Sequence, residues 1–267
     1  MSSSPSAPAP APCVAPHPTL KRYYAAPESK RAFLREIFDD TAPEYDRIEK
    51  WLGLGSGSWY RREALLRAGL AQGMRVLDVA VGTGLVAREE VRIVGSEKLV
   101  LGVDPSIGML SRAVESLKIP AVLGVGEQLP VRDAAVDFVS MGYALRHLGS
   151  LSAAFDEYFR VLKPGGRLCI LEITRPARAL PRMVVRGYMR WMVPWLTRLS
   201  GTSAASKKLW QYYWDTIDAC VPPERVMEAL RAAGFTDVAQ NTELGIFTEY
   251  TATRPGEKGI DSSAGVS

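Results

Sequence analysis

The sequence has little cysteine and almost no histidine. Its three cysteines, Cys13, Cys169 and Cys220, are far apart and form no Cys-x-x-Cys pair, which argues against a disulfide framework and a zinc site. The two histidines, His17 and His147, are too few soft ligands for a transition-metal centre. We therefore expect a protein without a metal ion, with reduced cysteines, in the cytoplasm.

Long apolar runs are also lacking. No run is long enough to span a bilayer, and the first residues have neither the basic nor the apolar region of a signal peptide. The net charge of +4 and the pI near 9.0 are only mildly basic, so composition gives no argument for nucleic acid as a partner. A chain of 267 residues that is 47% hydrophobic is long enough for one α/β domain with additional elements.

Residues 76–87 carry the pattern on which the functional interpretation depends. An apolar run too short for a helix is followed by Gly82 and Gly84 and then by a helix-permissive segment. This predicts a buried parallel strand, a tight turn and a helix start. The glycines allow positive φ, and the first N–H groups of the helix attract an anion such as a pyrophosphate or a carboxylate. Taken alone, the spacing Gly82-x-Gly84-x-x-Ala87 fits both NAD(P) and S-adenosylmethionine (SAM).

Strands and helices alternate along the chain around this turn. Further strands are predicted at residues 98–104, 119–124, 136–141, 167–173, 235–240 and 244–252, with a helix at 151–162. The alternation predicts an α/β domain over residues 28–254, with a mostly parallel seven-stranded sheet, helices on both faces and ligands at the carboxyl ends of the strands. Asp104 ends one strand about 20 residues after Gly84, where a carboxylate can accept both hydroxyls of a ribose. A helix cap is the alternative, but Pro105 and Ser106 already supply that signal.

The remaining segments differ in composition. Residues 1–27 are rich in Ala, Pro and Ser, and residues 255–267 in Gly and Ser, so both are predicted to be disordered tails. Residues 28–70 are expected to form N-terminal helices, with Pro43 ending or restarting the first. Residues 177–221 combine Arg182, Arg186 and Arg190 with many apolar and aromatic side chains and predict a helical insertion. It could be a helical cap on the sheet, or a lid over an aromatic or lipid-tailed substrate that touches a membrane through its arginines.

Several motifs occur together in one order. They are residues 38–46 (FDDTAPEYD), 77–84 (LDVAVGTG), 102–110 (GVDPSIGML), 126–130 (GEQLP), 160–167 (RVLKPGGR) and 171–176 (LEITRP). With them the chain resembles the Rossmann-like class I SAM-dependent methyltransferases, specifically the ubiquinone/menaquinone biosynthesis C-methyltransferase family, over about residues 33–253. That family methylates the ring of demethylmenaquinol and polyprenyl-benzoquinol.

The resemblance implies SAM as cofactor and assigns its site. Asp78, Gly82 and Gly84 would hold the methionine end, and Asp104 the ribose hydroxyls. The family has a polar residue where Val125 stands, so the adenine amine would use a backbone acceptor or Glu127. The other expected donor contacts are Val79, Ala80, Pro105, Met109, Gly126 and Met141.

The acceptor side departs from the family. Leu85 stands where the family has Asp, and residues 143–147 read Tyr-Ala-Leu-Arg-His in place of Phe-Gly-Leu-Arg-Asn. Of the Asp and Arg implicated in activating the quinol, only Arg146 remains. A phenol or quinol becomes a better nucleophile when it loses its proton, which His147, with an ordinary pKa of about 6.5, can accept while Arg146 stabilises the phenolate.

Four further residues are expected near the acceptor. Tyr45 and Asp46 belong to the front motif, which in the family covers the active site. Trp210 and Tyr212 fall where the family has two aromatic residues, so they are expected to pack against the ring or tail of the substrate.

The sequence therefore predicts methyl transfer from SAM to carbon or oxygen of a quinol, phenol or related aromatic small molecule. Two alternatives stay open: an NAD(P)-dependent oxidoreductase, and a protein of this fold that binds SAM without transferring methyl. A nucleic-acid methyltransferase has less support because the Asn/Asp-Pro-Pro-aromatic motif is missing after the fourth strand.

Overall fold

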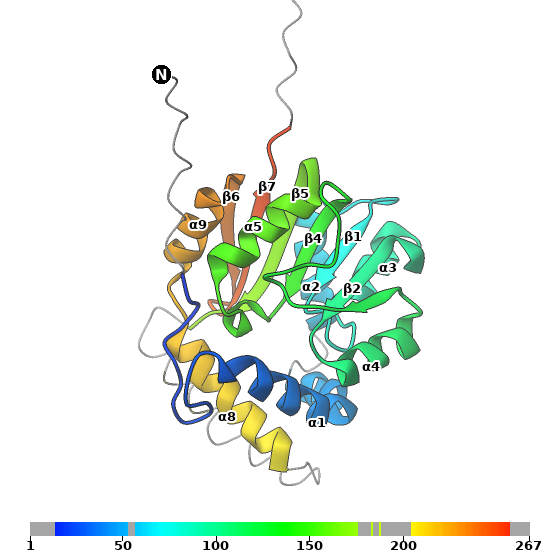
Figure 1. The fold of residues 1–267 in the computed structure, drawn as a ribbon. Coiled ribbons are helices and arrows are strands. Elements are labelled where there is room, and N and C mark those ends of the chain that lie inside the picture. Colours follow the sequence, from blue (N-terminus) through cyan, green and yellow to red (C-terminus); the bar gives the residue numbers. More distant parts are fainter. Residues whose placement is uncertain (1–13, 53–56, 176–182, 184–186, 188–203, 257–267) are drawn as a thin grey trace, which may run out of the picture.

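The computed structural model describes residues 14–52, 57–175, 183, 187 and 204–256. These residues include a seven-stranded sheet in the order β3-β2-β1-β4-β5-β7-β6 (Figure 1). The strands are β1 Val76–Val79, β2 Val100–Asp104, β3 Ala121–Leu123, β4 Val136–Gly142, β5 Leu162–Ile173, β6 Thr236–Glu243 and β7 Phe247–Thr253. All neighbours pair in parallel except β7, which runs antiparallel to β5 and β6. The predicted α/β class and mostly parallel sheet are confirmed.

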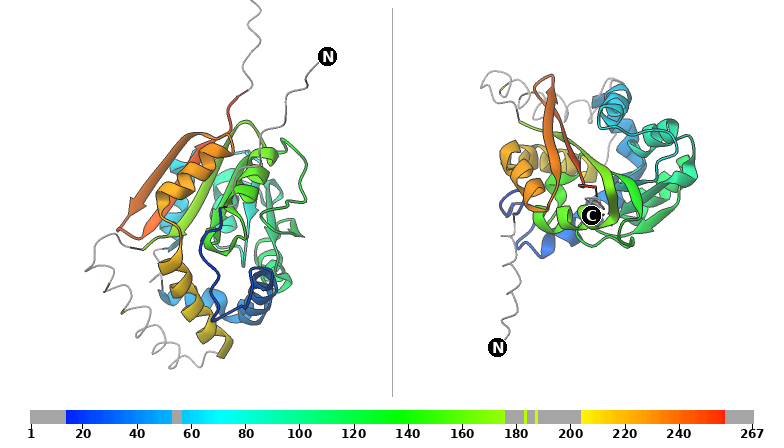
Figure 2. Two further views of the ribbon diagram at one scale, coloured as in Figure 1. Left: turned by 60° about the vertical axis from the view of Figure 1, so that its left-hand side comes forward. Right: turned by 90° about the horizontal axis from the view of Figure 1, so that it is seen from above.

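Helices cover both faces of the sheet (Figure 2). On one face α5 (Leu151–Val161) and α9 (Pro223–Ala232) pack on the apolar side chains of β1, β4 and β5. On the other face lie α2 (Gly57–Arg67), α3 (Ala87–Val94) and α4 (Ile107–Leu117). Because the central strands face helices on both sides, they need apolar residues at successive positions, and all four residues of β1 are buried.

A further layer lies along one edge of the sheet, where α1 (Ser29–Leu52) and α8 (Ala204–Ala219) run side by side (Figure 1). They pack through an aromatic cluster that includes Phe33, Tyr212 and Tyr213. The expectation that Pro43 ends or restarts the first helix is wrong, because α1 continues through it. A proline inside a helix loses one hydrogen bond, at a cost of about 3 kcal/mol. The burial of apolar side chains before Pro43 offsets that cost.

The N-terminal segment before α1 packs against the domain. The carbonyl of Val14 accepts a hydrogen bond from Leu151 N–H at 2.8 Å, and that of Pro16 accepts one from Val221 N–H, also at 2.8 Å. The Tyr24 side chain is buried beside Phe33. The prediction of a disordered tail is therefore wrong for residues 14–27, whose apolar side chains find partners despite the proline-rich composition. Residues 1–13 and 257–267 lie outside the described residues.

The predicted helical insertion at residues 177–221 is only partly described. Its C-terminal part is α8, followed by a turn into α9. Arg182, Arg186 and Arg190 lie outside the described residues. In the described ranges, no helix combines the length and the apolar character needed to cross a bilayer.

Candidate active site

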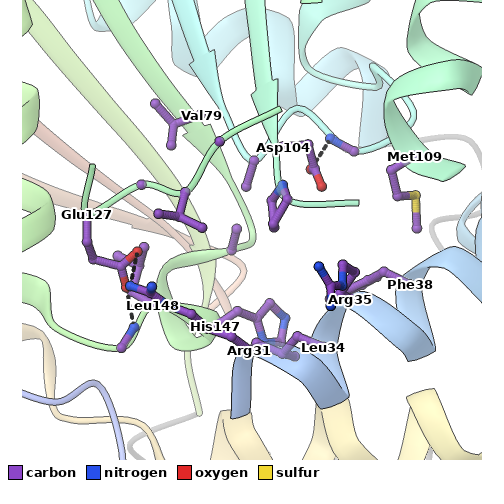
Figure 3. A pocket seen from close by; sticks show the side chains of 18 of the residues that line it. Arg31, Leu34, Arg35, Phe38, Val79, Asp104, Met109, Glu127, His147 and Leu148 are labelled. Carbon is purple, nitrogen blue, oxygen red and sulfur yellow. Dashed lines mark hydrogen bonds and ion pairs between the residues drawn. The ribbon is translucent and has the colours of Figure 1, made fainter. Parts of the chain in front are cut away.

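A cavity of about 1050 Å³ lies between the carboxyl ends of the central strands and α1 (Figure 3). It is lined by most of the residues predicted from the sequence. On the donor side these are Val79, Ala80, Gly82, Asp104, Pro105, Met109, Gly126, Glu127 and Met141, and on the acceptor side Tyr45 and His147. The topology explains this convergence, because parallel strands deliver their C-terminal residues to one edge.

The turn after β1 and the end of β2 form the donor half of the cavity. Gly82 has a φ of 57°, in the left-handed region that glycine adopts without strain. The Asp104 carboxylate accepts the N–H of Gly82 at 2.9 Å through Oδ2 and that of Ser106 at 2.8 Å through Oδ1. Burial raises the pKa of Asp104 to about 6, although both N–H donors act in the opposite direction. The carboxylate is therefore ionised at neutral pH, and its oxygens retain lone pairs for further donors.

This half of the cavity fits SAM. A Cβ at Gly82 would have no atom nearer than the Ala80 carbonyl at 4.0 Å, so the glycine leaves open space at the turn. Asp104 lines the same space with an ionised carboxylate that can accept ribose hydroxyls. The side chains of Pro105, Met109 and Leu123 supply apolar surface on which an adenine ring can pack.

Glu127 and Arg31 lie at the other end of the donor half (Figure 3). One carboxylate oxygen of Glu127 accepts the N–H of Gly149 at 2.5 Å, and the other lies 3.9 Å from the Arg31 guanidinium. The loop that carries Glu127 is held close to the core, because a Cβ at Gly126 would approach the Tyr158 hydroxyl to 2.7 Å. Glu127 is thus placed to accept a hydrogen bond from a ligand amine.

Asp78 and Gly84 do not line the cavity, which corrects the expectation that they hold the methionine end directly. Asp78 is fully buried behind the turn, near Glu90 of α3, and the Ser140 hydroxyl lies near both carboxyl groups. Burial and the neighbouring acids Glu90 and Asp104 raise the pKa of Asp78, and burial raises that of Glu90 to about 7. Gly84 is needed because a Cβ there would lie 2.6 Å from Leu117. Both residues support the turn from behind.

The acceptor half of the cavity is aromatic. The His147 ring stacks on Tyr212 and Tyr213, with centroids 5.4 and 5.7 Å apart, and meets the edge of Phe38 at 5.5 Å. The hydroxyl groups of Tyr45 and Tyr213 lie 2.9 Å apart. Phe38, Tyr45, His147 and Tyr213 all line the cavity. This wall suits a flat ring, because aromatic side chains pack well on aromatic ligands.

His147 is held as a neutral imidazole. Burial lowers its pKa well below 6.5, and the positive charges of Arg146, Lys30 and His17 lower it further. Its Nδ1 is 3.4 Å from the Tyr212 hydroxyl, while Nε2 has no hydrogen-bond partner among the described residues. The buried Nε2 of this neutral imidazole is an acceptor without a donor, and the hydroxyl group of a ligand that reaches it can supply one.

Arg146 differs from the expectation, because it lies behind the cavity wall. Its Nη1 donates to Glu172 Oε1 at 2.5 Å and to the Tyr143 carbonyl at 2.7 Å, and both charged side chains are buried. The guanidinium lies over the Tyr213 ring, 4.8 Å from its centroid. Since Glu172 compensates its charge, the expected stabilisation of a phenolate by Arg146 is not supported. No sequence pattern indicated that Glu172 would face Arg146.

Asp46, Trp210 and Tyr212 also lie outside the cavity lining. Asp46 accepts the Thr83 hydroxyl at 2.5 Å and so ties α1 to the glycine turn. Trp210 packs edge-on against Tyr213, and Tyr212 supports His147 from behind. Cavity-lining residues missed from the sequence include Lys30, Arg31, Leu34, Phe38 and Tyr213. Helical periodicity could have found Phe38 and Tyr213, since both lie on the buried stripes of their helices.

Comparison with known proteins agrees with this geometry. Residues 26–254 match the profile of the ubiE/COQ5 methyltransferase family. A demethylmenaquinone methyltransferase from Symbiobacterium thermophilum is 32% identical, over 86% of this chain and 95% of the relative. The ubiquinone/menaquinone biosynthesis C-methyltransferase UbiE from Geobacter sulfurreducens is also 32% identical, over 85% and 89% of the two chains.

Solved structures show the same fold at lower identity. A SAM-dependent methyltransferase from Thermotoga maritima superposes with a TM-score of 0.59 at 21% identity, over 82% of this chain and 99% of the other. Phosphoethanolamine N-methyltransferase 2 from Haemonchus contortus, solved in complex with SAM, has a TM-score of 0.53 at 17% identity, over 74% and 53%. The predicted methyltransferase activity and SAM cofactor are confirmed, and the NAD(P) alternative has no support. The chain belongs to the ubiE/COQ5 methyltransferase family and is a SAM-dependent methyltransferase.

Proposed function

We propose that this enzyme methylates a hydroxylated aromatic ring of the quinol type, with His147 as the group that receives the hydroxyl proton. The observation that carries this proposal is the neutral imidazole of His147 with an unpartnered Nε2 in an aromatic wall. The wall faces the same cavity as Asp104 and Gly82, which supports adjoining binding sites for donor and acceptor.

The names of the relatives support a quinol-type acceptor. Those named above are a demethylmenaquinone methyltransferase and a ubiquinone/menaquinone biosynthesis enzyme. A ring of this kind can pack against the wall formed by Phe38, Tyr45, Tyr213 and His147, which all line the cavity. The family's Asn is replaced by His147 and its Asp by Leu85, so we propose that the ring differs from the usual quinone precursor in its substituents.

The chemistry required of the protein is modest. When bound, SAM supplies an electrophilic methyl group on a sulfonium. As a bond forms between that carbon and the ring, the ring loses electron density and its hydroxyl becomes more acidic. His147 can then accept the hydroxyl proton, even though its pKa is below the usual value. Transfer to oxygen releases this hydroxyl proton. Transfer to carbon is completed when the methylated ring carbon loses its own proton and the oxygen regains one. S-adenosylhomocysteine leaves in both cases, and His147 can carry the proton to and from the hydroxyl.

The test compares wild type with His147→Asn, which restores the family's residue and cannot accept a proton. Methyl-labelled SAM is supplied with a short-tailed demethylmenaquinol or with simple phenols, and NMR of the product separates carbon from oxygen methylation. We expect kcat to fall at least about 100-fold, the usual range for loss of a general base. The Kd for SAM should stay within about twofold. A variant with wild-type kcat would refute the role of His147.

A lipid-tailed acceptor and a membrane contact belong to the same proposal. Relatives named for menaquinone biosynthesis and the apolar composition of residues 177–221 support it. Binding to vesicles with and without anionic lipid, measured by sedimentation, tests the contact. Replacing Arg182, Arg186 and Arg190 by Gln should reduce binding to anionic vesicles, because each basic side chain near such a surface contributes about 1 kcal/mol.

A further inference from the structure

The turn that carries His147 begins with a strained residue. Tyr143, which follows β4, has a φ of 59°, a region that bulky side chains rarely adopt. Its N–H donates to the Leu171 carbonyl at 2.7 Å, and its carbonyl accepts from Arg146 Nη1 at 2.7 Å. Both sides of the strained residue are thus fixed, one by β5 and one by Arg146.

Glu172 holds Arg146 in turn. Besides the ion pair with Nη1, its second oxygen Oε2 lies 3.3 Å from the backbone N–H of Arg146, which is the residue directly before His147. Oε1 also accepts the N–H of Ile173 at 2.8 Å, which fixes the carboxylate against its own strand. Glu172 is 1% exposed and Arg146 2% exposed, so water does not compete for these bonds.

A second route leads from Glu172 to the imidazole through side chains. The Arg146 guanidinium lies 4.8 Å from the centroid of Tyr213, and the Tyr213 ring is tilted by only 28° from that of His147. Moving the guanidinium would release the ring on which His147 rests. The Glu172 carboxylate can therefore influence His147 in two ways, through the backbone of the turn and through the side chains of Arg146 and Tyr213.

Charge gives Glu172 an additional effect. His147 faces Arg146 on its own turn, Lys30 on α1, His17 on the N-terminal segment, and the hydroxyls of Tyr212 and Tyr213 on α8. The Glu172 carboxylate forms an ion pair with Arg146, the positive neighbour that precedes His147 in the chain. Without that carboxylate the guanidinium would disfavour the imidazolium more strongly, so the pKa of His147 would fall.

We propose that Glu172 is a positioning residue for His147, acting through Arg146 to fix the strained turn at Tyr143 and the ring of Tyr213. The inference rests on the proposed role of His147. The buried ion pair of Glu172 and Arg146 then contributes to catalysis indirectly, through the position of His147, and does not contact the acceptor.

The experiment compares Glu172→Gln with Glu249→Gln. Glu249 on β7 is also buried and also paired with an arginine, Arg67 of α2, at 2.9 and 3.0 Å, but it does not line the cavity. In donor-free protein labelled at histidine, NMR follows the His147 signals, which ring currents from Tyr212 and Tyr213 displace. Glu172→Gln should reduce that displacement and lower the titration midpoint by at least about half a pH unit, whereas Glu249→Gln should change neither.

Kinetics supply the second readout. Glu172→Gln should lower kcat about tenfold or more, a fraction of the contribution of a general base, while KM for SAM changes less than about threefold. Glu172→Asp, which keeps the charge, should recover part of kcat. Unchanged His147 signals in Glu172→Gln would overturn the inference. If Glu172→Gln shifts the His147 signals but the wild-type protein methylates no aromatic substrate, the positioning role of Glu172 stands and the proposed function is refuted.

If Glu172→Gln does not fold, the paired variant Arg146→Met with Glu172→Leu removes both charges and keeps apolar volume, an exchange that buried ion pairs often tolerate. Here the pKa of His147 should rise, because a positive neighbour is gone, while kcat still falls about tenfold because the turn is released. Wild-type kcat in this folded variant would overturn the inference as well.

Discussion

Replacing Asp104 by Asn tests the donor site most directly. The carboxylate holds the N–H groups of Gly82 and Ser106 at 2.9 and 2.8 Å and keeps lone pairs for the two hydroxyls of a ribose. Asn has one acceptor oxygen and adds an N–H₂ group, so at least one backbone donor and one ribose hydroxyl lose a charged acceptor. Each such hydrogen bond contributes about 1.5–3 kcal/mol.

We expect SAM binding to weaken by about 3 kcal/mol, or roughly 100-fold in Kd. The pH dependence follows from the same carboxylate. With its pKa raised to about 6 by burial, Asp104 takes up a proton as the pH falls below 6, and a protonated carboxyl accepts hydrogen bonds poorly. Wild-type affinity should therefore be constant above about pH 7 and fall up to about tenfold per unit below about pH 6, whereas the Asn variant should show a smaller change.

Isothermal titration calorimetry between pH 5 and 8 measures both effects. Asp137→Asn is the matched control, because Asp137 also holds a backbone N–H, that of Arg75 at 2.9 Å, and pairs with Lys163 at 2.6 Å, but outside this cavity. It should leave the Kd for SAM unchanged. An Asp104→Asn protein that bound SAM as tightly as wild type would refute the assignment of the ribose site.

Two further predictions concern the turn behind the donor site. Burial raises the pKa of Glu90 to about 7, above its unfolded value of about 4.5, so its ionisation lowers stability as the pH rises from about 4.5 to 7. Glu90→Gln should raise the free energy of unfolding by about 3 kcal/mol at pH 8 and not at pH 4, measured by urea denaturation; equal effects at both pH values would contradict this. Gly84→Ala should destabilise by about 2 kcal/mol, because the residue has a φ of 90° and its Cβ would meet Leu117 at 2.6 Å. An unchanged melting temperature would show that the turn relaxes.

Much of the fold follows from local sequence patterns. The strand before Gly82 and the strand ending at Asp104 are short apolar runs bounded by turn residues, and the structure has both. Their parallel pairing then brings Gly82 and Asp104 together without further information. The donor site was accessible to sequence reasoning because its residues sit at strand ends.

The acceptor site was less accessible, because it depends on which way side chains point after tertiary packing. Arg146 and His147 are adjacent in sequence, yet one faces Glu172 and the other lines the cavity. Successive side chains of a strand point to opposite faces of the sheet. Val79 of β1 lines the cavity, so its neighbour Asp78 points the other way, toward Glu90. Pro43 is a helix breaker by local preference, but packing of α1 overrides it.

The attachment of α1 at two places has a consequence for binding. Near the donor half, Asp39 of α1 accepts hydrogen bonds from the Ser106 hydroxyl and the Gly108 N–H, and near the acceptor half Lys30 donates to the carbonyls of Arg146 and Leu148. The single helix α1 therefore forms part of the cavity wall for both ligands. Whatever displacement of α1 favours one ligand alters the space offered to the other, so occupation of the two compartments is energetically linked, and the linkage is reciprocal.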